Sequence, residues 1–187
     1  MPRVGLTTAQ VVSTASSLID EIGIDKLTLA HIAKQLNVQL PSLYKHIASL
    51  QDLRERLVVE SQRELLETMK NATIGRSGRQ ALLALAVAAR DWGLAHPGRY
   101  AITLAAPHVP GDGSEEMLEF TLRILEAFNL KDDDVIDAAR VLRATLHGFI
   151  SLDTRGGFGL PRDVNHSFVR AIQGLGDQFT TWGNRAI

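Results

Sequence analysis

The sequence predicts an all-α protein with an N-terminal three-helix head and a larger C-terminal helical body, about nine helices in total. Apolar residues recur at spacings of three and four along most of the chain, which is the helical period. Residues that start or stop helices bound these stretches, and no stretch shows the strict alternation of a strand. We place a helix-turn-helix domain at residues 1–50 and the helical body at residues 51–187.

Composition is that of an ordinary globular chain, with 45% hydrophobic and 22% charged residues among 187. No apolar run is long enough to span a membrane, and no export signal is visible, so we expect no membrane association and a cytoplasmic location. The absence of cysteine excludes disulfides and thiolate metal sites. Residues 1–50 carry a net charge of +1 and the rest −2, which permits nucleic-acid binding without establishing it.

The first helix has one apolar face and clear ends. Thr7 and Gln10 form a capping box in front of it, and Gly23 is a suitable stop. Its inward residues fall at spacings of four, three and four: Val11, Ala15, Leu18 and Ile22.

A helix-turn-helix follows. Thr28 can cap a short second helix, and Asn37 tolerates the left-handed conformation of a tight turn. A third helix begins near Leu40–Pro41, where proline is tolerated, and runs to about Ile47. Its leading end would enter the major groove of DNA.

The body shows further helices separated by polar or glycine-bearing breaks. A capping box at Ser49–Asp52 opens a long helix that runs to about Met69. The breaks fall at Asn71–Gly78, Ala95–Gly98, Pro107–Gly113 and Gly156–Pro161. Between them we expect apolar helical stretches around 82–92, 100–106, 114–128 and 133–153, and a final helix from Val164 to Trp182.

The helix-turn-helix separates inward from outward side chains. A small core is expected from Ile32, Ala33, Leu36, Val38, Leu43 and Ile47. The outward face is rich in hydrogen-bonding groups and poor in acids, as a phosphate-facing surface should be. Its residues are Gln39, Leu40, Pro41, Ser42, Tyr44, Lys45 and His46.

The pattern of Thr28, Ile32–Ala33, Leu36–Val38 and Leu43–His46, followed by a helix opening at Ser49, resembles the DNA-binding signature of the TetR (tetracycline-repressor) family. The string Leu40–His46 is near that of the repressor that names the family. The resemblance implies a DNA head, a linking fourth helix and a ligand-binding, dimerising body. It also implies that Tyr44 and His46 contact phosphates, that Gln39–Ser42 meet bases, and that Thr28 caps the second helix against the DNA backbone.

Several positions depart from the family pattern. Asn37 replaces the usual turn glycine, Gln39 the usual serine cap, and Ile47 a usual aromatic residue. Leu50 stands where lysine is frequent, and Ala30 where the family's namesake has a base-reading arginine. The operator of the namesake therefore cannot be carried over.

Three of the proposed DNA contacts have alternatives. Leu40 either contacts a thymine methyl group or packs beneath the turn. Lys34 and Lys45 either reach phosphates or are solvated surface lysines. Tyr44 is less ambiguous, because an exposed tyrosine in so short a helix is hard to explain without a partner for its hydroxyl.

Residues 79–182 resemble a subgroup of TetR-type C-terminal domains with a His-Gly motif, here His147–Gly148, although a tryptophan usual just before the motif is missing. A small-molecule effector is expected in the body, with His147 as the foremost contact. Taken one at a time, the candidates are more readily explained as core residues than as ligand contacts: Trp92, Tyr100, His108, Phe128, His147 and Phe149. The long apolar stripe of the final helix suggests a homodimer through the last two helices, although core packing alone could explain it.

Two other classes of function were weighed. An enzyme is disfavoured because the six histidines are scattered and no nucleophile elbow, zinc-binding His-Glu-x-x-His or phosphate-binding glycine loop occurs. We expect no catalytic residue, metal or cofactor. The second alternative is a helical dimer that binds a small molecule but whose head no longer binds DNA. Salt-dependent binding to bulk DNA separates it from a regulator.

Overall fold

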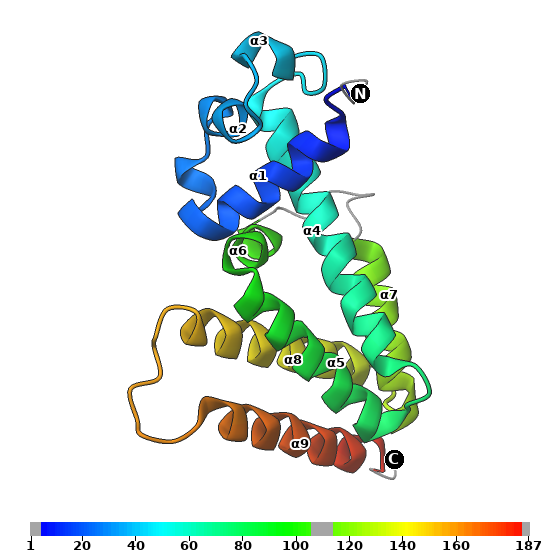
Figure 1. Cartoon of the computed structure of the whole chain (residues 1–187). Coiled ribbons are helices and arrows are strands. Elements are labelled where there is room, and N and C mark those ends of the chain that lie inside the picture. Colours follow the sequence, from blue (N-terminus) through cyan, green and yellow to red (C-terminus); the bar gives the residue numbers. More distant parts are fainter. Residues whose placement is uncertain (1–4, 106–113, 185–187) are drawn as a thin grey trace. The chain divides into compact units, whose positions relative to one another are not determined.

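The computed structural model describes residues 5–105 and 114–184, and all regular structure in these ranges is helical. This confirms the all-α prediction. The described residues form nine α-helices, with one 3₁₀ turn between α1 and α2 and another between α7 and α8. Figure 1 shows how the helices follow one another along the chain. The helices are α1 (Thr8–Ile22), α2 (Leu29–Gln35), α3 (Leu40–Leu43), α4 (Leu50–Thr73), α5 (Gly78–Ala95), α6 (Pro97–Ala105), α7 (Ser114–Leu125), α8 (Asp133–Asp153) and α9 (Val164–Gly183), and the turns are η1 (Ile24–Lys26) and η2 (Glu126–Phe128).

The chain divides into two compact units. The first contains α1–α3, the part of α4 up to Gln62, and α6, and the second contains Arg63–Ala95 and the helices α7–α9. The first unit therefore extends beyond the residues 1–50 assigned to the head from the sequence. The reason is that α6, a segment remote in sequence, packs against α1.

The capping residues of α1 act as expected. The Thr7 hydroxyl oxygen accepts the Gln10 backbone N–H at 3.2 Å, and Gln10 Oε1 accepts the Thr7 N–H at 2.9 Å. Gly23 ends the helix with a φ of +81°, a conformation that costs glycine little. The apolar face of α1 is buried at Val11, Ala15 and Ile19.

The turn between α2 and α3 forms as predicted, but α3 is shorter. Asn37 has a φ of +52°, and the Val38 N–H donates to the Ala33 carbonyl at 2.9 Å, which closes α2 with a Schellman-type cap. The α-helix of α3 ends at Leu43 instead of Ile47. The His46 and Ile47 N–H groups both donate to the Leu43 carbonyl, so the chain tightens into turns there.

In the first unit, α6 is fastened to the end of α1 by backbone contact and charge. Asp20 accepts both the Arg99 backbone N–H at 2.8 Å and its guanidinium Nε–H at 2.7 Å. A carboxylate at a helix N-terminus is favourably placed against the helix dipole. Gly98 lies so close to the Ile19 carbonyl that a Cβ at residue 98 would approach its oxygen to 1.9 Å.

The second unit is a bundle in which α5 packs against α7, α8 and α9, and Figure 1 shows α8 and α9 running beside each other. The apolar stripe of α9 is buried within this unit, with Phe168 and Phe179 fully covered. Gly176 faces Arg79 and Leu82 of α5. Core packing therefore accounts for the stripe that suggested a dimer interface, and any interface must use other faces of α8 and α9.

None of the helices in the described ranges combines the length and the apolar character needed to cross a membrane.

Candidate nucleic-acid interface

The short helix α3 is held by its buried leucine and leaves its other side chains outside. Leu43 is fully buried and Ile47 nearly so, whereas Leu40 is 40% and Tyr44 55% exposed. Both of these exposed side chains are large and apolar in part, and neither belongs to the cluster of core residues that contains Leu43. A face that exposes such groups next to a lysine is typical of a binding surface.

The segment after α3 is fixed by side chains from neighbouring helices. The Thr8 hydroxyl donates to the His46 carbonyl at 3.4 Å. At the start of α4, Ser49 Oγ accepts the Asp52 N–H at 3.0 Å and the Asp52 carboxylate accepts the Ala48 N–H at 2.8 Å. The Ala48 N–H, followed by the guanidinium of Arg56, lowers the pKa of Asp52. These bonds confirm the predicted cap and define the path of residues 44–49.

The structure places all nine predicted DNA-contact residues in the first unit. Thr28 caps α2 by accepting the His31 N–H at 3.3 Å and remains exposed. Gln39 makes no side-chain cap bond, so its amide is available to a partner. Lys34, Pro41 and Lys45 are exposed and Ser42 and His46 are half-buried.

The segment that forms this surface carries charge of one sign. Residues 26–51 contain three lysines and no aspartate or glutamate. A second histidine, His31, is exposed in the first turn of α2, three residues after Thr28. Sequence reasoning left His31 out of the contact set, although its spacing from Thr28 places both on one helix face.

The predicted effector contacts are not gathered at one place. Trp92, Phe128, His147 and Phe149 lie in the second unit, Tyr100 lies in the first, and His108 lies outside the described residues. Phe128 packs edge-on against Phe179 at 5.8 Å between ring centroids, whereas Phe149 packs against Phe168 at 5.4 Å.

These two aromatic contacts lie at opposite ends of α9. Phe168 and Phe179 are eleven residues apart on that helix, or roughly 16 Å at the helical rise. Phe128 and Phe149 therefore belong to separate parts of the core and do not line one small cavity.

His147 has the most perturbed environment of these candidates. Burial, followed by the positive charge of Arg143, lowers its pKa from 6.5 to about 4. The Arg143 Nε–H lies 3.3 Å from His147 Nε2, which fits a neutral ring that accepts a hydrogen bond. The imidazole is thus uncharged at pH 7.

We expect this histidine to make the protein less stable in acid. Between pH 6.5 and 4 the unfolded chain binds a proton that folded His147 does not, so stability falls as the pH falls through this range. The full loss is about 3 kcal/mol, at about 1.4 kcal/mol per pH unit. The measurement is urea unfolding from pH 7 to pH 4, with His147→Gln expected to show a shallower decline. The exposed His166 provides the control, since His166→Gln should follow the wild type.

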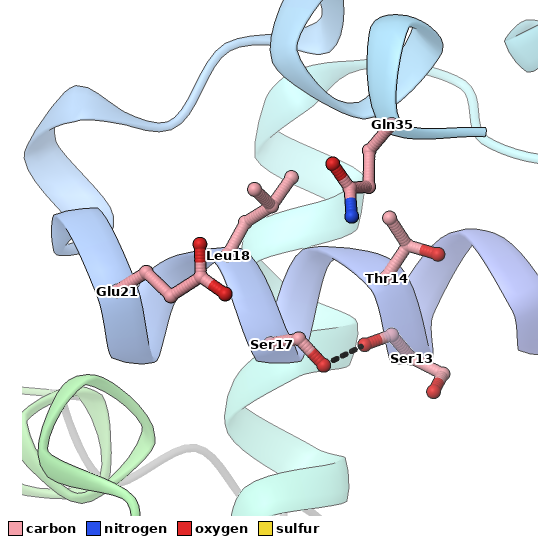
Figure 2. Close-up of a pocket in the computed structure, with 6 residues that line it drawn as sticks. All are labelled: Ser13, Thr14, Ser17, Leu18, Glu21 and Gln35. Atoms are coloured by element: carbon pink, nitrogen blue, oxygen red, sulfur yellow. Dashed lines mark hydrogen bonds between the residues drawn. The ribbon is translucent and has the colours of Figure 1, made fainter. Parts of the chain in front are cut away.

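A shallow hollow of about 140 Å³ also lies in the first unit, between α1 and α2 (Figure 2). The Ser17 hydroxyl at its wall donates to the Ser13 carbonyl at 3.3 Å, and Glu21 and Gln35 also line it. A carboxylate with no lysine or arginine among the lining residues makes it unsuitable for phosphate. Within the described ranges, no group of three or more histidines or carboxylates is placed to hold a metal ion.

Comparison with known proteins gives concordant matches. The HTH-type transcriptional regulator YobS of Bacillus subtilis (strain 168) is 33% identical over 178 residues, which cover 92% of each protein. The tetracycline repressor protein class A from transposon 1721 of Escherichia coli is 36% identical over 138 residues, covering 68% of this chain and 58% of the repressor.

The fold is shared with solved structures. A variant of TetR from Acinetobacter baumannii AYE, in complex with minocycline, matches with a TM-score of 0.73 over 97% of each chain at 20% identity. The family profile "Tetracyclin repressor-like, C-terminal domain" matches residues 82–175. The narrower subgroup with the His-Gly motif stays a prediction. On this evidence the chain, a regulator and not an enzyme, belongs to the TetR family of transcriptional regulators.

Proposed function

We propose that the protein is a ligand-responsive repressor that acts in the cytoplasm, binds a palindromic operator as a homodimer, and leaves it when a small-molecule effector binds. The observation that carries this proposal is the exposed face of α3, where Leu40 and Tyr44 stand outside while Leu43 is fully buried. A short helix anchored by one side and bare on the other suits insertion into the major groove.

The contacts divide by chemistry. Gln39 to Ser42 lie at the start of α3, the end that would enter the major groove. There the Gln39 amide can both donate and accept hydrogen bonds, and Leu40 can contact a thymine methyl group. Phosphates would be bound by the hydroxyls of Thr28 and Tyr44 and by the cationic Lys34 and Lys45, with His46 beside them.

The homodimer would form through the outer faces of α8 and α9. On α8, Ala144, Gly148 and Leu152 are exposed and follow one another at four-residue spacing. On α9, a Cβ at Gly174 would meet open space, so a partner helix can approach there. Two heads related by a two-fold axis read the two halves of a palindrome, which one recognition helix alone is too short to do.

The effector would act by preferring a conformation of the dimer whose heads no longer match the operator spacing. Moving the population from almost fully competent to almost fully incompetent requires about 5.5 kcal/mol of differential binding. A dimer with two effector sites needs about half of that from each. Among the predicted effector contacts, His147 and Trp92 both lie in the second unit, and we propose that they contact the effector.

Selection of bound DNA from a random pool tests the proposal. A recovered palindrome supports both the regulator and its two-fold symmetry. Recovery of no preferred sequence, together with the absence of salt-dependent binding to bulk DNA, would contradict it and favour a small-molecule-binding protein whose head has lost DNA affinity.

Tyr44→Phe and Lys45→Ala test the phosphate contacts. We expect Tyr44→Phe to weaken binding by a similar factor on all DNA sequences, because a phosphate contact reads no base. Lys45→Ala should lower the slope of log affinity against log salt by roughly one. The control is Lys131→Ala, an exposed lysine of the second unit, which should leave the slope unchanged. An unchanged slope for Lys45→Ala removes this residue from the phosphate contacts.

A further inference from the structure

The hollow between α1 and α2 is lined mainly by side chains that accept hydrogen bonds. It lies within the first unit and has a volume of about 140 Å³ (Figure 2). All of its lining side chains except Leu18 are polar, and Leu18 itself is 9% exposed. The lining residues are Ser13, Thr14, Ser17, Leu18 and Glu21 of α1 and Gln35 of α2. The hollow therefore combines hydroxyl, amide and carboxylate oxygens with one apolar contact.

Glu21 gives the hollow a negative charge that the described residues do not neutralise. Its neighbour Asp20 is bound by Arg99, whereas no lysine or arginine in the described part of the chain pairs with the Glu21 carboxylate. Glu21 also lies in the last turn of α1, which contains no basic residue. Because the C-terminal end of a helix carries a partial negative charge, a cation is favoured at this end of α1.

The other polar groups of the hollow can accept hydrogen bonds as well. The Ser17 hydroxyl donates to the Ser13 carbonyl at 3.3 Å, so the hydroxyl oxygen keeps its lone pairs for a ligand. Figure 2 shows the Gln35 side chain reaching from α2 toward α1. Its amide oxygen accepts no hydrogen bond from the residues that the structure describes. A group with several N–H donors can therefore bond to the carboxylate, the amide and a hydroxyl together.

The size and charge of the hollow exclude other kinds of ligand. An anion would be repelled by Glu21. A divalent metal ion held by protein alone needs several oxygen ligands of high charge, and the lining residues supply a single carboxylate. Drug-sized molecules occupy clefts of about 300–1,000 Å³, so the hollow is large enough for one functional group and not for a whole molecule of that size.

We infer that this hollow binds the primary ammonium group of a small aliphatic amine. The ammonium nitrogen donates its N–H bonds to the Glu21 carboxylate, the Gln35 amide oxygen and the Ser17 hydroxyl. The methylene groups next to the nitrogen contact Leu18. None of the predicted effector contacts or DNA contacts lines the hollow, so the inference goes beyond the proposed function and does not depend on it.

A free amine fits this hollow better than a lysine of a partner protein does. A stable protein–protein interface buries about 1,200–2,000 Å² in total, of which a hollow that holds one functional group supplies only a small part. A short amine needs no further surface, because its ammonium group and first methylene groups account for the contacts that the lining residues offer.

Titration of the full-length protein with propylammonium chloride, followed by NMR at constant ionic strength, tests the site. We expect saturable shifts of the Gln35 side-chain amide and the Ser17 backbone amide. Their midpoint should lie in the millimolar range, because an exposed ion pair contributes little. Tetramethylammonium has the same charge but no N–H donor, so it should cause no saturable shift. Equal responses to the two cations would show a general attraction to positive charge and would overturn the inference.

Glu21→Gln tests the carboxylate, because this change removes the charge and keeps the shape. We expect the midpoint for propylammonium to rise by about fivefold or more. Asp25→Asn is the matched control, since Asp25 is an exposed carboxylate of the neighbouring turn η1 that does not line the hollow. Its midpoint should equal that of the wild type. An unchanged midpoint for Glu21→Gln, or an equal rise in both variants, would contradict binding in the hollow.

Dilution of the protein without amine identifies the source of the ammonium group. For a free amine, the Gln35 and Ser17 resonances should not depend on protein concentration. Shifts on dilution of the wild type that are absent in Glu21→Gln would show that a lysine of a second copy occupies the hollow, and would overturn the assignment to a small molecule.

Operator binding by the same protein separates this inference from the proposed function. A protein that binds propylammonium as expected but selects no operator would contradict the repressor and support the ammonium site. A protein that selects a palindrome but shows no saturable shift with propylammonium would overturn the ammonium site alone.

Discussion

Gly98→Ala is expected to lower the free energy of unfolding by about 3 kcal/mol or more. The added Cβ would lie 1.9 Å from the Ile19 carbonyl oxygen, 2.3 Å from its carbon and 2.8 Å from the Asp20 nitrogen. All three are backbone atoms within or at the end of a helix, so no side-chain rotation relieves the clash. The start of α6 must therefore withdraw from α1.

This withdrawal also breaks the bonds between Arg99 and Asp20, whose side chains are each only 14% exposed. Denaturant unfolding measures the loss, and hydrogen exchange at the Arg99 amide should accelerate, because its acceptor on Asp20 is lost. Gly5→Ala is the control, since a Cβ at Gly5 meets nothing within 4 Å. If Gly98→Ala were as stable as this control, α6 could not be docked on α1 as described.

Leu43→Ala is expected to cost about 2–5 kcal/mol of folding stability in the first unit and to abolish specific DNA binding. Leu43 is fully buried and is the only residue of α3 that is buried. Truncating it leaves a cavity beneath the recognition helix and removes its main attachment. Thermal unfolding and operator titration of the same sample measure the two effects.

Leu40→Ala is the matched control on the same helix. Leu40 is 40% exposed, so its truncation should change stability by less than about 0.5 kcal/mol. If Leu40 contacts a thymine methyl group, the loss of affinity should be confined to operators with thymine at one position, and should amount to about 1–3 kcal/mol there. Equal losses on all operator variants would refute base reading by Leu40.

The helices of the first unit were predictable because local chemistry fixes their ends. The Thr7 capping box, the Thr28 cap, the left-handed Asn37 and the Gly23 stop all depend on residues within a few positions of one another. The end of α3 was predicted four residues too late. Residues 44–47 have helical side-chain spacing, but their N–H groups bond to form turns, which depend on the cap of α4 and on Thr8.

The exposure of the predicted DNA contacts followed from the same local pattern, since exposure on a short helix depends on which side is apolar. The arrangement of the predicted effector contacts could not be read from the sequence in this way. Aromatic residues such as Phe128 and Phe149 occur in protein cores as well as in ligand sites. Only three-dimensional packing showed that these two contact different ends of α9.

By itself the sequence determined the all-helical class, the helix-turn-helix and its outward residues, because caps, turns and apolar period act over a few residues. Only the tertiary structure decided that α6 belongs with α1 and that the stripe of α9 is core. Those facts depend on contacts between segments that are remote in sequence. The burial of a side chain there is determined by the segment that packs against it, not by the type of the residue.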